Sequence, residues 1–119
     1  MSDTDSDSDP FCEPNNPMYN VGDLVELPMM QGMQTKGIVV SVHLKSIEQR
    51  RLYWFADEYN YLVSIDAFGG DYHWCNVDGI VKKLDLPIEY KLSMVSKFGD
   101  WWYGLHKSVY QNILIEAIN

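Results

Sequence analysis

Residues 36–43 read Lys-Gly-Ile-Val-Val-Ser-Val-His, a run of β-branched side chains that follows a glycine. Such residues favour extended backbone, and the side chains of a strand alternate between its two faces. This segment is therefore the clearest strand in the chain. We expect its two faces to carry Ile38, Val40 and Val42 on one side, and Val39, Ser41 and His43 on the other.

A further strand is expected before this segment. Residues 21–23 (Val-Gly-Asp) predict a turn into a strand at 24–27. Pro28 should end that strand, because proline cannot donate a backbone hydrogen bond to a neighbouring strand. Residues 29–35 contain three methionines and no clear period, so an adaptable apolar loop is expected there.

Three more strands are expected after it. Alternating segments at 59–65 and 72–75 predict a hairpin, because the Phe-Gly-Gly-Asp run at 68–71 supplies the positive φ of a tight turn. Residues 76–79 predict a short turn, with 3₁₀ geometry as one form of it, and 80–84 predict the closing strand.

Residues 44–58 fit two interpretations. A helical turn is compatible with 44–51, whereas Leu-Tyr-Trp-Phe-Ala at 52–56 is compatible with a strand. Asp57-Glu58 then predicts a turn. Both interpretations stay open from the sequence alone.

Beyond Pro87 the apolar residues recur at helical intervals of three or four. The stripe consists of Tyr90, Met94, Phe98, Trp102, Leu105, Val109, Ile113 and Ala117. Gly99 and Gly104 interrupt it, so we expect two helices with a break between 97 and 104. The last helix should run from about 105 to 118.

The first twenty residues differ from the rest. Residues 2–9 alternate Ser or Thr with Asp, and three prolines follow. Such a segment cannot bury enough apolar surface to offset the entropy of ordering, so 1–20 should form a disordered acidic arm. The sequence thus divides into this arm, a β-rich domain at 21–85 and a helical C-terminal extension at 86–119.

The order of the strand segments resembles that of the small SH3-like or KOW-like β-barrels. Those barrels start with a Gly-Asp-Leu-Val strand, continue with a Gly-Ile-Val-Val strand, and end on an aromatic strand, a turn and a short closing strand. The resemblance is carried by Val-Gly-Asp-Leu-Val (21–25), Gly-Ile-Val-Val-Ser-Val (37–42), Tyr-Leu-Val-Ser-Ile (61–65), His-Trp-Cys (73–75) and Ile-Val-Lys-Lys-Leu (80–84). It covers about residues 21–84 and implies an α+β, mainly β fold: a small SH3-like β-barrel with the helical extension.

Composition excludes several functions. The net charge is −8, with nine Lys and Arg against seventeen Asp and Glu, which argues against nucleic-acid binding as the main role. The KOW-like resemblance keeps that role as a minority alternative, with Arg50-Arg51 and Lys82-Lys83 as its candidate patch. The two cysteines form no disulfide framework and indicate a reducing cytoplasm. The sequence also predicts no membrane span and no secretory signal.

Metal binding and catalysis are weakly indicated. His73 and Cys75 share one strand face, and Cys12 and His43 could complete a tetrahedral set, but closely spaced pairs such as C-x₂-C are absent from the sequence. We expect instead that Trp74 enters the core while His73 and Cys75 lie on the opposite face. No nucleophile elbow or phosphate loop is present either, so no metal, no cofactor and no enzymatic activity are expected.

Aromatic residues are the main candidates for a binding surface. They exceed what a small barrel buries, and aromatic side chains are favoured at interface centres. The alternative is that they pack beneath the C-terminal helices. The candidate partner-binding residues are Tyr53, Trp54, Phe55, Tyr59, Tyr72, Trp101 and Trp102, with Tyr61 considered beside them.

The helical stripe poses a similar choice. Its apolar residues must be covered, either by the protein's own barrel or by another copy through residues 98–118. We therefore expect a non-enzymatic protein–protein interaction module. The resemblance implies a phage origin, because proteins of this pattern are frequent in tailed-phage genomes. An accessory virion component of capsid or tail is favoured slightly over an intracellular inhibitor of a host factor, so the expected location is the virion or the host cytoplasm.

Overall fold

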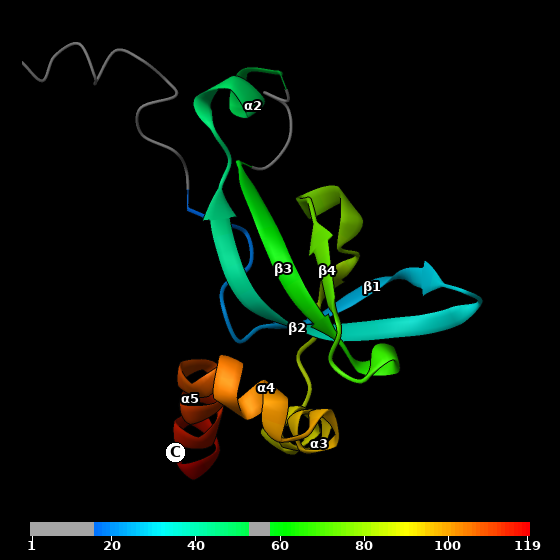
Figure 1. Ribbon diagram of the computed structural model, residues 1–119, viewed down its shortest axis with the longest axis vertical. Coiled ribbons are helices and arrows are strands. Elements are labelled where there is room, and N and C mark those ends of the chain that lie inside the picture. Colours follow the sequence, from blue (N-terminus) through cyan, green and yellow to red (C-terminus); the bar gives the residue numbers. More distant parts are fainter. Residues whose placement is uncertain (1–15, 53–57) are drawn as a thin grey trace, which may run out of the picture.

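The computed structural model describes residues 16–52 and 58–119, which form a strongly bent sheet with the C-terminal helices at one end (Figure 1). The strands are β1 (Leu24–Met30), β2 (Met33–Leu44), β3 (Tyr59–Ile65), β4 (Tyr72–Cys75) and β5 (Lys82–Lys83). The α-helices are α2 (Ile47–Leu52), α3 (Ile88–Phe98), α4 (Asp100–Leu105) and α5 (Lys107–Ile118), and the 3₁₀ turns are η1 (Asp66–Phe68) and η2 (Val77–Gly79).

Within these residues the strands form one antiparallel sheet in the order β4-β3-β2-β1-β5. The long strand β2 pairs with β1 through its first half and with β3 along its second half. Over the described part of the chain the sheet is not closed into a barrel, and β4 and β5 are its two edges. The expected α+β class is confirmed, and the finer SH3-like barrel stays a prediction.

Several expected elements are confirmed. The strands at 59–65 and 72–75 have the predicted bounds, and the turn before β5 is the 3₁₀ turn η2. The helical interpretation of 44–51 is confirmed in part: α2 begins at Ile47, and Leu44 is the last residue of β2. Of the alternative strand at 52–56, Leu52 belongs to α2 and the rest lies outside the described residues. The closing strand β5 is shorter than expected, although the backbone amides of Val81 and Leu84 continue its pairing with β1.

The first hairpin differs from the prediction. Pro28 does not end β1, which continues to Met30, and the expected loop at 29–35 is a tight turn at Gln31 and Gly32. The register between β1 and β2 shifts between Leu27 and Met30, so proline sits at an irregularity in the strand pairing. Positive φ at both turn residues matches the twist of a two-residue hairpin.

A bulge in β2 overturns the expected side-chain alternation. Val39 pairs with Val63 and Ser41 with Leu62, which leaves Val40 as the extra residue between them. Val40 packs toward the helices with Ile38, as expected, whereas Val42 lies beyond the bulge and packs on the opposite face with Val39. The expectation that Val42 shares a face with Val40 is wrong, because an inserted residue reverses the strand's phase beyond it.

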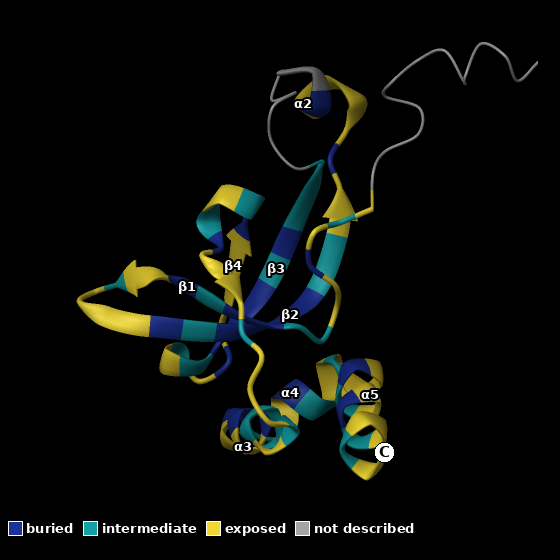
Figure 2. Ribbon diagram, turned by 180° about the vertical axis from the view of Figure 1, so that it is seen from behind, coloured by how far each residue is buried: buried dark blue, intermediate teal, exposed yellow. Residues whose placement is uncertain are grey.

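The two sheet faces carry separate hydrophobic cores. One, the sheet core, contains Tyr19, Val25, Leu27, Val39, Tyr61, Val63, Ile65, Cys75 and Ile80. The other, the helix core, joins the sheet to α3, α4 and α5 through Leu24, Ile38, Val40, Met94, Val95, Phe98, Trp102, Val109 and Ile113. Figure 2 shows the buried sides of these helices.

The sheet core also takes a residue from the expected acidic arm. Tyr19 is buried and meets Tyr61 edge-on, with ring centroids 5.5 Å apart. The backbone amide of Met18 donates to the hydroxyl of Tyr61 at 3.0 Å. Part of the expected arm, residues 16–20, is thus described as folded chain, and the acidic run at 1–15 lies outside the described residues.

The C-terminal segment folds into three helices instead of two. The predicted break is present at Gly99, whose φ of 91° suits glycine. A second break falls at His106, and Gly104 lies within α4 and does not end it. Residues on the inner side of all three helices contribute to the helix core.

Gly37 lies where two strands approach closely. A Cβ added there would sit 2.4 Å from Cγ1 of Val63 and 2.7 Å from the carbonyl oxygen of Ser64. Because the second of these atoms belongs to the backbone, a side chain at this position would push β2 away from β3. The close approach requires glycine.

Gly37→Ala is expected to lower the free energy of unfolding by about 1–3 kcal/mol, because it overpacks a dense interior. Gly104→Ala is the matched control, since a Cβ there meets nothing within 4 Å and the position is helical. That control should stabilise the protein by about 0.5–1 kcal/mol. Chemical denaturation of both variants measures the difference, and equal stability for the two would contradict the argument.

Candidate binding face on β4 and α4

A buried hydrogen-bond chain attaches α4 to the sheet. The indole N–H of Trp102 donates to the hydroxyl oxygen of Ser64 at 3.0 Å. That hydroxyl donates to the carbonyl oxygen of Gly70 at 2.6 Å. Ser64 and Trp102 are both fully buried, so the chain links α4, β3 and the turn before β4 away from water.

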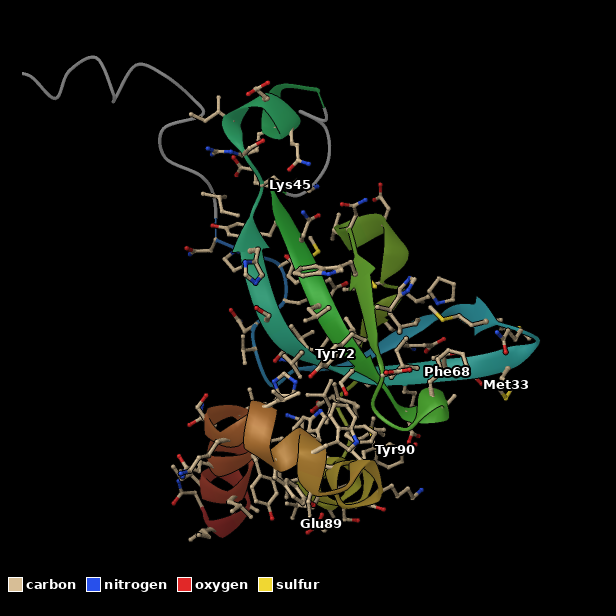
Figure 3. The ribbon with its side chains drawn as sticks, viewed as in Figure 1. Met33, Lys45, Phe68, Tyr72, Glu89 and Tyr90 are labelled. Carbon is tan, nitrogen blue, oxygen red and sulfur yellow. The ribbon has the colours of Figure 1, made fainter. Side chains whose placement is uncertain are left out.

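This attachment places two other residues of the α4 region beside β4. The ring of Trp101 meets Tyr72 at a centroid distance of 6.1 Å, and the ring of His106 meets it at 5.3 Å. The hydroxyl of Tyr72 and Nε2 of His106 also share a hydrogen bond. Figure 3 places Tyr72 at the boundary between the sheet and the helices.

Trp74 continues this surface along β4. It lies two residues from Tyr72, so both side chains point to the same face of the strand. Its ring meets His43 of β2 at 5.3 Å, and Nε2 of His43 lies 2.6 Å from the hydroxyl oxygen of Ser41. Two groups of ring contacts, one at Tyr72 and one at Trp74, therefore lie along the same face of β4.

We call His43, Tyr72, Trp74, Trp101 and His106 the aromatic face. Trp74 is 55% exposed, Trp101 44% and Tyr72 39%, so each of the three large rings offers a broad surface to solvent. None of the five residues carries a full charge when histidine is neutral. The face is an amphipathic surface built from three separate stretches of sequence.

The orientation of β4 is the reverse of the prediction. Trp74 was expected in the core and is exposed, whereas Cys75 is buried in the sheet core. Burial raises the pKa of the Cys75 thiol to about 11, so it stays protonated near neutral pH. A protonated buried thiol is a poor nucleophile and a poor metal ligand.

The structure separates the predicted partner-binding residues. Tyr72 and Trp101 lie on the aromatic face, and Tyr59 is half-buried beside the sheet core. Trp102 and Tyr61 are fully buried, so their rings are not offered to a partner. Tyr53, Trp54 and Phe55 lie outside the described residues.

Trp74, His43 and His106 belong to the face but were absent from the predicted set. The signal for Trp74 was its spacing of two from Tyr72 on an expected strand. Nothing local marks the two histidines, because tertiary contacts bring them to β4.

Other predicted sites are also placed by the structure. Arg50 is buried with its guanidinium 3.6 Å from Glu58, so it does not contribute to an exposed basic patch with Lys82 and Lys83. Residues 16–52 and 58–119 bring together no group of three or more His, Cys, Asp or Glu that could hold a metal ion. Within the same ranges, no helix is long and apolar enough to cross a membrane.

The helical stripe is covered in part by the protein itself. Phe98, Trp102, Val109 and Ile113 pack in the helix core. The remaining exposed apolar side chains of α4 and α5 are Trp101, Leu105, Ile115 and Ile118. The predicted oligomer contact through 98–118 stays a prediction, and these four exposed side chains are available to it.

No protein-family model, curated protein or solved structure matches this chain.

Ser64→Ala is expected to lower the free energy of unfolding by about 1–3 kcal/mol, because it leaves the buried indole N–H of Trp102 without an acceptor. Trp102→Phe removes that donor. In the Trp102→Phe background, Ser64→Ala should therefore cost about 1 kcal/mol less. Urea denaturation of the four proteins in this cycle measures the coupling, and additive costs would exclude an important role for the bond.

The stability should also depend on pH through His106. Burial lowers the pKa of His106 below the ordinary value of 6.5. Below pH 6.5 the unfolded chain binds more protons at this residue than the folded one, so acid favours unfolding. The stability that neutral His106 contributes is therefore fully present above pH 6.5, and it decreases as the pH falls toward the lowered pKa.

Denaturation at several values between pH 5 and 8 should therefore show the protein losing stability toward acid. His106→Asn should lose less over the same range, because its side chain does not titrate. Identical profiles for the two proteins would contradict the assignment.

Proposed function

We propose that this protein is a non-enzymatic protein-binding module whose partner docks on the aromatic face. The observation that carries the proposal is that Tyr72 and Trp74 share one face of β4, with Trp101 against the first ring and His43 against the second, and that the three large rings are open to solvent. Trp and Tyr are enriched among the residues that supply most binding energy at protein interfaces.

The elements that carry the aromatic face hold its side chains in fixed positions. Tyr72 and Trp74 project from a strand, and Trp101 is adjacent to the fully buried Trp102. A rigid support reduces the conformational entropy that binding would otherwise cost. The hydroxyl of Tyr72, the indole N–H groups and the two imidazoles provide polar atoms that orient a partner.

The strand order and the 3₁₀ turn before β5 support an SH3-like assignment for residues 21–85, which we retain as part of this proposal. The phage origin implied by that resemblance is likewise proposed. A virion component and a host protein are both compatible with an uncharged aromatic surface, and the identity of the captured partner distinguishes them.

Affinity capture with the full-length chain, followed by mass spectrometry, tests the proposal. Replacing Trp74 and Trp101 together by alanine should abolish recovery of the partner, since a central aromatic contributes about 2 kcal/mol or more, which is roughly 30-fold in affinity. Met29→Ala is the control, because Met29 is exposed on the β1–β2 hairpin and absent from the face.

Circular dichroism should show both variants folded, since all three side chains are exposed. Equal recovery of the partner by the double variant and by the wild type would refute the aromatic face as the binding surface. Recovery of a structural protein of the particle would support the virion role, and recovery of a cellular protein would support the inhibitor role.

A further inference from the structure

The two edges of the sheet differ in how they are protected. β5 has two residues, both exposed lysines, and charged residues on a short edge strand discourage pairing with another chain. β4 is twice as long, contains no charged residue when His73 is neutral, and exposes Tyr72 and Trp74. In the described residues, β4 pairs on one side only, with β3.

The pairing with β3 identifies the open backbone groups of β4. The amide of Ile65 donates to the carbonyl of Asp71 at 2.8 Å, and His73 lies opposite Val63. In an antiparallel pair, alternate residues face the neighbouring strand. Asp71, His73 and Cys75 therefore face β3, which directs the N–H and C=O groups of Tyr72 and Trp74 away from the sheet.

No backbone hydrogen bond in the described part of the chain uses those outward groups. The residues with the open backbone are also the residues whose rings form the centre of the aromatic face. A strand added at this edge would therefore gain main-chain hydrogen bonds and lie beside two exposed rings.

The charge around β4 indicates the chemistry of the added strand. Residues 66–81 contain three aspartates and neither lysine nor arginine. Asp71 directly precedes the strand and Asp78 lies three positions beyond its last residue, and both are exposed. Acidic residues at both ends of an uncharged strand complement a segment that carries Lys or Arg.

We propose that an extended, basic segment of a partner protein adds to β4 as a further strand. This inference rests on the proposed function and specifies how the partner binds. The backbone of the segment pairs with the outward groups of Tyr72 and Trp74, and its alternate apolar side chains lie on those rings. Its basic side chains meet Asp71 and Asp78. This is strand addition at a sheet edge, in which main-chain bonds give affinity and alternate side chains give specificity.

A second copy of the protein is a less favourable occupant. Two copies of β4 paired with each other would bring the aspartates that flank one strand close to those that flank the other. Like charges brought together at an interface oppose binding, and the whole chain carries a net charge of −8.

Amide hydrogen exchange in the full-length chain is the first measurement. The amides of Tyr72 and Trp74 should exchange fast, and those of His73 and Cys75 slowly. Slow exchange at Tyr72 and Trp74 in the monomer would mean that these backbone amides already have hydrogen-bond acceptors, which would overturn the proposal. Slow exchange that appears only as a dimer forms at high concentration would assign the edge to a second copy and overturn it as well.

The second measurement uses a displayed library of random twelve-residue peptides, selected on the full-length chain. The enriched peptides should alternate apolar side chains and contain Lys or Arg, and binding should slow the exchange of Tyr72 and Trp74. Methylating one alternate set of backbone nitrogens in a selected peptide should weaken binding about tenfold or more, and methylating the other set should not. Failure to enrich any peptide would overturn the inference.

Charge reversal tests the basic character of the segment. Asp71→Lys should weaken binding of the selected peptides, whereas Asp85→Lys should leave it unchanged. Asp85 is the matched control because it is exposed and lies beyond β5, away from the strand that the peptide would join. Both substitutions replace Asp by Lys, so they change the net charge equally. An equal effect of the two variants would exclude contact between Asp71 and the peptide.

The outcomes separate this inference from the function on which it rests. Peptides that need Trp74 and Trp101, but tolerate methylation of either set of nitrogens, would leave the aromatic face as a binding surface and remove strand addition. Peptides that bind equally well without Trp74 and Trp101 would remove the proposed function itself.

Discussion

The buried bond between Trp102 and Ser64 is the interaction on which the arrangement of this protein depends. It joins α4 to β3 and, through the hydroxyl of Ser64, to the carbonyl of Gly70. An indole N–H buried without an acceptor would be costly, so the bond permits only a narrow range of positions for α4. The position of α4 also places Trp101, and His106 at the end of the helix, beside Tyr72. The aromatic face therefore results from the way the helices attach to the sheet.

The attachment requires a sheet with apolar residues on both faces. Val40 packs toward the helices with Ile38, and the bulge at Val40 returns Val42 to the sheet core. Gly37 permits the close approach of β2 and β3 at the start of the same strand. The long strand β2 thus contributes residues to both the sheet core and the helix core. The helices cover the apolar face of the sheet that would otherwise be exposed. An open surface lies along β4, where Trp74 is exposed and, within the described residues, the outer edge has no paired strand.

Much of the fold could be predicted from local patterns. β3 and β4 have the expected bounds, because alternation and glycine turns are determined by residues close in sequence. The break at Gly99 was likewise marked by a residue that favours positive φ. The break at His106 and the continuation of β1 past Pro28 were missed. Each depends on contacts or strand register made elsewhere in the fold. Of the candidate site, Tyr72 and Trp101 could be found as aromatic residues in excess of a small core.

The sequence by itself determined the acidic charge, the strand and helix periods, and a surplus of aromatic side chains. Only the tertiary structure decided which of those side chains are exposed. Trp101 and Trp102 are neighbours of one residue type, yet one is on the surface and the other is fully buried, because the position of α4 directs only Trp102 toward Ser64. The four residues of β4 likewise contain two alternating sets, and either could have faced the core. Pairing with β3 buried Cys75 and left Trp74 outside, since the face of a strand is set by its partner strand and not by its own composition.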